Sequence, residues 1–101
     1  MPRPPLSSVQ DWPFGATGRR RLLEVVTAQG GPWTQTDLGT SSGLHEKRSV
    51  YGHLLALEQL ELIELVDRLY RPGSNEPLRL AVADLLRLLE PYSSVSLRKP
   101  R

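Results

Sequence analysis

Helix-breaking residues divide this chain of 101 residues into short segments, and this division constrains the fold more than any other feature. A Gly-Gly-Pro sequence occupies residues 30–32, a glycine turn lies at residues 42–44, and a proline stands at position 91. Residues 71–77 are a dense cluster of turn-forming types, and four prolines lie within the first fifteen residues. Because proline and glycine interrupt helices and mark turns, each helix or strand must be short.

The first half of the chain predicts two helices. Thr17 can serve as the N-cap of a helix that ends before residue 30, with an apolar face at residues 22, 23, 25 and 26 and three arginines, residues 19–21, largely outside that face. Thr34 and Asp37 have the N-cap and N3 spacing of a capping box. A short second helix is therefore expected to run to about Ser41.

The longest helix is expected from about His45 to Leu60. Val50, Leu54 and Leu57 stand at the i, i+4, i+7 spacing of a buried stripe. The glycine turn at residues 42–44 precedes this helix and allows the chain to reverse between the second and third helices.

The second half predicts a hairpin followed by a helix. Residues 62–70 are rich in Ile, Leu and Val and are expected to form the first strand, residues 71–77 a long tip, and residues 78–81 the returning strand. A last helix is expected over residues 82–90, where Pro91 stops it. No regular element is expected before Thr17.

Length and composition indicate one domain with one core, because a second core would have no material. We expect an N-terminal arm at residues 1–16, a folded domain at 17–90 and a basic tail at 91–101. The chain has no cysteine, which removes disulfides, thiol nucleophiles and cysteine-containing metal sites. No apolar run suggests a membrane span or a secretory signal, so we expect a cytoplasmic protein without a membrane partner.

The order of these elements resembles a winged helix-turn-helix domain. The residues that carry the resemblance are the segment 34–44, then Val50, Leu54 and Leu57, and then the segment 60–63. These residues look like the MarR and ArsR type of bacterial transcriptional regulator. The resemblance implies a fold that is mainly α with a small β-hairpin: a three-helix core, a wing and a C-terminal helix. Glu61 stands where such proteins usually have a glycine that ends the third helix.

The resemblance also implies a DNA-binding surface. In this family the third helix enters the major groove and the wing lies over the backbone or the minor groove. An arginine near a helix N-terminus can reach a guanine edge or a phosphate, and hydroxyl groups can add phosphate contacts. The residues assigned to DNA binding on this basis are His45, Lys47, Arg48, Ser49, Tyr51, His53, Arg68, Arg71 and Arg79, the last three as wing residues.

Catalytic and metal chemistry find no support in the sequence. His45 and His53 are eight residues apart, which on a helix is about 12 Å along the axis, so they cannot share one metal ion. No nucleophile elbow, catalytic triad or phosphate-binding glycine loop is present. We therefore expect no enzyme activity, no cofactor and no metal.

Two functions remain open. The first is sequence-specific binding of double-stranded DNA by a small homodimeric regulator. The second is a winged-helix module for protein–protein interaction in a larger assembly. Leu55 and Gly52 on the expected outer face of the third helix, and a net charge of only +2, favour the second function.

Overall fold

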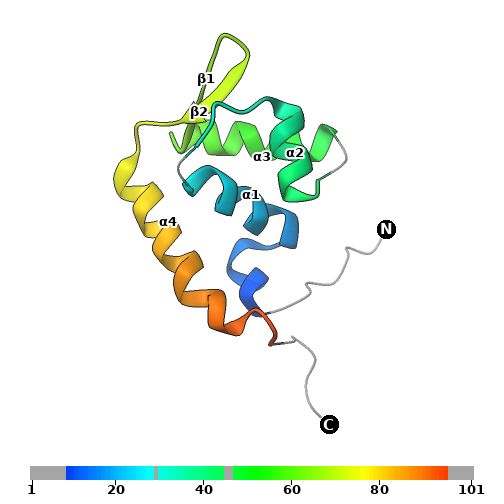
Figure 1. Cartoon of the computed structure of the whole chain (residues 1–101), viewed down its shortest axis with the longest axis vertical. Coiled ribbons are helices and arrows are strands. Elements are labelled where there is room, and N and C mark those ends of the chain that lie inside the picture. Colours follow the sequence, from blue (N-terminus) through cyan, green and yellow to red (C-terminus); the bar gives the residue numbers. More distant parts are fainter. Residues whose placement is uncertain (1–8, 29, 45–46, 96–101) are drawn as a thin grey trace.

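The computed structural model describes residues 9–28, 30–44 and 47–95. Its elements follow in the order η1 (Val9–Phe14), α1 (Thr17–Thr27), α2 (Gln35–Ser42), α3 (Lys47–Gln59), β1 (Ile63–Val66), β2 (Leu69–Pro72), α4 (Glu76–Leu89) and η2 (Glu90–Tyr92). Helices α1, α2 and α3 lie together below the hairpin, and α4 runs along one side of the molecule (Figure 1). The predicted fold class is confirmed, and this topology is consistent with a winged helix-turn-helix.

One cluster of apolar side chains joins the three helices to the hairpin. Its members come from α1, α2, α3 and the start and end of the hairpin: Leu22, Val26, Leu38, Val50, Leu54, Leu57, Leu62, Ile63 and Tyr70. The stripe predicted on the third helix is therefore confirmed as its buried face. Burying a leucine side chain of this kind stabilises a fold by about 1.5 to 3 kcal/mol, so this cluster fixes the position of α3.

The hairpin is shorter than predicted and lies earlier in the chain. Strands β1 and β2 are antiparallel, with Ile63 opposite Pro72 and Val66 opposite Leu69. The connecting residues Asp67 and Arg68 both have positive φ, at 52° and 67°. Two consecutive residues of this kind match a tight two-residue hairpin turn, whose handedness suits the twist of the strands. The expected long tip at residues 71–77 was wrong, because this turn contains no glycine or asparagine to reveal it.

The expected returning strand at residues 78–81 is instead the first part of α4. Asn75 caps this helix, because its side-chain oxygen accepts a hydrogen bond from the Leu78 N–H at 3.2 Å. Pro77 stands in the first turn, where its missing N–H costs nothing. The cluster of turn-forming residues therefore marks a helix start rather than a hairpin tip.

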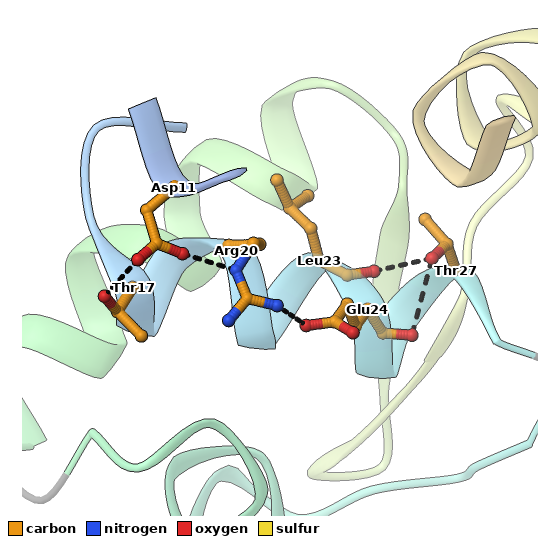
Figure 2. A network of polar contacts seen from close by, with 6 residues as sticks. All are labelled: Asp11, Thr17, Arg20, Leu23, Glu24 and Thr27. Atoms are coloured by element: carbon orange, nitrogen blue, oxygen red, sulfur yellow. Dashed lines mark hydrogen bonds and ion pairs between the residues drawn. The ribbon is translucent and has the colours of Figure 1, made fainter. Parts of the chain in front are cut away.

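A 3-10 helix, η1, precedes α1, so the expectation of no regular element before Thr17 was wrong. Phe14 and Asp11 of this helix are buried. The Asp11 carboxylate accepts a hydrogen bond from the Thr17 hydroxyl at 2.6 Å and forms an ion pair with Arg20 (Figure 2). Thr17 is thus not the N-cap of α1, which is Ala16, and its hydroxyl instead ties η1 to α1.

An isolated backbone bridge ties the segment before α2 to the two-stranded sheet. Trp33, between α1 and α2, forms an antiparallel bridge with Tyr70 of β2 through hydrogen bonds of 2.7 and 2.8 Å. This bridge was not predicted, because a single residue between two turns has no strand pattern. The bridge connects the entry to α2 with the hairpin.

Candidate nucleic-acid interface

The turn between α2 and α3 sets the direction of α3. Gly43 ends α2 at φ +75°, and its N–H donates to the carbonyls of Gly39 and Thr40. The Leu44 N–H donates to the Gly39 carbonyl at 2.9 Å. A left-handed φ favours glycine because it has no Cβ, so the predicted reversal at Gly43 is confirmed.

The start of α2 is fixed by the predicted capping box. The Asp37 N–H donates to the Thr34 hydroxyl at 3.0 Å, and the Thr34 N–H donates to the Asp37 carboxylate at 3.0 Å. These bonds, the backbone one first, hold the pKa of Asp37 below its usual value. Backbone groups at both ends of α2 therefore have hydrogen-bond partners, so the helix is held firmly against α3.

Helix α3 divides into a buried face and an exposed face. The exposed face mixes polar residues, residues with large apolar side chains and a glycine: Ser49, Tyr51, Gly52, Leu55 and Gln59. Tyr51 and Leu55 are 53% and 41% exposed, which is high for large side chains with apolar surface. A surface of this kind can fit against another macromolecule.

The predicted site residues of the third helix fall in three groups. His45 lies outside the described residues, and Lys47 and Arg48 are the first two residues of α3. Ser49 and Tyr51 are exposed. Lys47, Arg48, Ser49 and Tyr51 therefore all lie in the first five residues of α3.

His53 differs from its predicted neighbours because it faces α1. It is half-buried beside Arg19, in a groove of about 620 Å³ between α1 and α3 that Leu23, Gly52 and Leu60 also line. Burial first, and then the charge of Arg19, lower the pKa of His53. The lowered pKa favours the neutral imidazole at pH 7.

Two of the three predicted wing arginines lie on the hairpin. Arg68 is in the turn at the tip and is exposed. Arg71 lies opposite Glu64 on the neighbouring strand, and its Nε donates to the Glu64 carboxylate at 2.6 Å. Both partners are exposed, so water screens this ion pair and a phosphate can compete with Glu64 for the guanidinium.

Arg79 does not belong to the wing. It lies in the first turns of α4 and is half-buried in a hollow that Ala28 and Pro72 also line. The expectation of a wing arginine here followed from the misplaced returning strand. Only Arg68 and Arg71 among the three therefore share the hairpin.

The three consecutive arginines of α1 were predicted to lie largely outside the apolar face, with no role assigned to them. In the structure the side chain of Arg19 lines the same groove as Ser49 and His53 of α3. The start of α1 lies near the turn before α3, because a Cβ on Gly18 would meet the Leu44 side chain. No sequence pattern connects these two segments.

Searches against family models, curated proteins and solved structures found no match for this chain. Among residues 9–28, 30–44 and 47–95, no group of three or more His, Cys, Asp or Glu side chains is placed to hold a metal ion. In the same part of the chain, no helix has the length and apolar character needed to cross a bilayer.

Proposed function

We propose that the protein binds double-stranded DNA as a homodimeric transcriptional regulator that resembles the MarR and ArsR type. Helix α3 enters the major groove, and the β1–β2 hairpin lies over the backbone or the minor groove. DNA binding of this kind takes place in the cytoplasm. The proposal assigns the protein no catalytic activity and no cofactor.

One observation carries the proposal. The capped helix α2 and the turn at Gly43 hold α3 with one face in the core and the other in solvent, beside a hairpin whose tip carries Arg68. An exposed helix and an adjacent basic hairpin are the two elements with which a winged helix reads a duplex.

The proposal requires two copies of the chain, because a two-fold symmetric site is read by two recognition helices. The exposed side of α4 supports a contact between copies. Ala81, Leu85 and Leu88 of α4 and Tyr92 of η2 are exposed and repeat at spacings of four, three and four residues, which is the pattern of a helix–helix seam. Only Leu86 of this helix is buried in the monomer, and Leu85 and Leu88 are 39% and 55% exposed.

Selection of duplexes from random DNA, followed by substitution of one residue on each element, tests this function. Arg48→Ala is expected to weaken binding to the selected duplex by roughly 1 to 3 kcal/mol and to relax the sequence preference at one base pair. Arg68→Ala is expected to lower the affinity for the selected and the scrambled duplex by the same factor, since phosphate contacts carry no sequence information. No enrichment of any duplex, or unchanged affinity in both variants, would contradict the proposal.

A second candidate function is a protein-interaction module. The exposure of Leu55 on α3 favours it, because the fully buried centres of protein interfaces are depleted in charge and rich in apolar groups. The two functions differ in their response to salt, which weakens phosphate contacts strongly and apolar contacts little.

A further inference from the structure

Helix α1 carries three consecutive arginines near its start, and they point in different directions because successive residues on a helix are about 100° apart. The middle one, Arg20, is used inside the fold. Its Nε donates to the buried carboxylate of Asp11 and its Nη1 to Glu24 (Figure 2). Its side chain is only 13% exposed and its charge is matched by two carboxylates.

The outer two arginines, Arg19 and Arg21, are exposed. Among the ion pairs that the described residues form, none includes either of them. The three neighbouring guanidinium groups therefore differ in role: the central one holds η1 on α1, and the two beside it keep their full charge in solvent.

Both exposed arginines lie next to the helix-turn-helix. Arg19 lines the groove along α3 together with Ser49 and His53, and its charge lowers the pKa of His53. Arg21 lies over the turn between α2 and α3, because its Nη1 is 3.1 Å from the point that a Cβ on Gly43 would occupy. Arg19 therefore lies along the groove beside α3, and Arg21 lies beside the turn that precedes α3.

We propose that Arg19 and Arg21 bind phosphate groups of the DNA backbone near the start of α3, so that α1 is a phosphate-contacting element in addition to the hairpin. This inference rests on the proposed function. A guanidinium offers a planar pair of donors that matches two phosphate oxygens, and such contacts fix the orientation of a protein on the duplex without reading bases. The arrangement places two positive charges that have no ion pair among the described residues next to α3, so a chain with a net charge of only +2 can still attract a polyanion at this surface.

The test measures the salt dependence of duplex binding for the full chain, on a selected and a scrambled duplex. Each phosphate contact contributes about 0.9 to the slope of log affinity against log salt, so Arg19→Gln or Arg21→Gln in a homodimer should lower that slope by about 1.8. Both duplexes should lose affinity by the same factor. Arg19→Lys and Arg21→Lys should keep most of the slope, because the charge remains.

Arg87→Gln is the matched control. Arg87 is an exposed arginine on α4, paired with Asp84, and its substitution removes the same charge away from α3. It should leave the salt slope unchanged. Thermal unfolding of each variant checks that the fold is intact, which is expected because neither Arg19 nor Arg21 has an ion pair among the described residues to lose.

Two failures are distinguishable. If Arg48→Ala weakens binding but the slopes of Arg19→Gln and Arg21→Gln equal those of the wild type and Arg87→Gln, the inference is overturned and the proposed function stands. If the wild-type protein binds no duplex at all, the proposed function fails and this inference fails with it.

Discussion

At the scale of single residues, the end of α3 depends on an unusual glutamate. Glu61 has φ +59°, its N–H donates to the Glu58 carbonyl, and the Leu62 N–H donates to the Leu57 carbonyl. These two bonds form a Schellman motif, in which glycine is the usual left-handed residue. Glu61 therefore accepts a backbone conformation that costs a residue with a Cβ roughly 1 to 2 kcal/mol.

Glu61→Gly is accordingly expected to raise the free energy of unfolding by up to about 1 kcal/mol, since the relief of strain exceeds the extra chain entropy of glycine in the unfolded state. Urea denaturation measures this change. Ala56→Gly is the control within the same helix, where glycine should lower stability by about 1 kcal/mol. A loss of stability in both variants would show that Glu61 is not strained.

His53 makes stability depend on pH. Burial and then the charge of Arg19 lower its pKa from the usual 6.5, so the folded protein binds fewer protons than the unfolded chain below that pH. The contribution of neutral His53 to the free energy of unfolding is fully present above pH 6.5 and is lost as pH falls through the folded-state pKa of this residue. We expect the wild type to lose more stability than His53→Gln between about pH 7.5 and about pH 5. Equal losses in the two proteins, measured by urea denaturation, would contradict this assignment.

Hydrogen bonds between residues close in the sequence could be predicted, and those between residues of different elements could not. The capping box of Thr34 and Asp37 spans four consecutive residues, so the sequence pattern contains all of it. The role of Thr17 depends on Asp11, which lies in a different element. No spacing rule connects such a pair, because the contact exists only once η1 has packed on α1.

At the scale of elements, the junction between β2 and α4 is tied to the end of α3. The Gly73 N–H donates to the Leu62 carbonyl, and the Asn75 N–H donates to the Glu61 carbonyl. A Cβ on Gly73 would come within 2.1 Å of the Glu61 carbonyl oxygen, which is backbone and cannot move aside alone. Only glycine fits there, so this contact fixes where α4 begins.

A pair of alanine substitutions tests this junction. Gly73→Ala should destabilise the protein strongly, because the backbone at Glu61 or Gly73 must shift. Gly52→Ala, where a Cβ would meet open space, should instead raise stability by up to about 1 kcal/mol through helix propensity. Thermal unfolding compares the two variants. A stable Gly73→Ala protein would contradict the close approach.

The helices with a regular apolar pattern could be predicted from the sequence, and the hairpin could not be placed correctly. The apolar stripe at Val50, Leu54 and Leu57 follows the helix period, and burial of one face produces that pattern directly. The hairpin was misplaced because its turn, Asp67-Arg68, takes left-handed conformations without the glycine or asparagine that usually marks such a turn. The sequence therefore located α3 of the candidate site, but put Arg79 on the hairpin instead of on α4.

At the scale of the whole molecule, the exposed seam of α4 is where two copies are proposed to meet. Replacing Leu85 and Leu88 together by glutamate should convert the dimer to a monomer and weaken DNA binding, because two half-sites would no longer be read together. Leu80→Glu is the control, since Leu80 is 53% exposed on the same helix but lies outside the seam. Light scattering at micromolar concentration measures the mass. A monomeric wild type, with and without DNA, would contradict dimerisation.

The most direct test of the central claim is the salt dependence of wild-type binding to a selected duplex, measured beside Leu55→Glu. If α3, the hairpin and α1 together make six or more phosphate contacts per dimer, affinity should fall by about a thousandfold or more between 50 and 200 mM salt. Leu55→Glu should abolish binding, because it puts a negative charge on the exposed face of α3. A flat salt response, with a Leu55→Glu protein that binds the duplex as well as the wild type, would contradict the account.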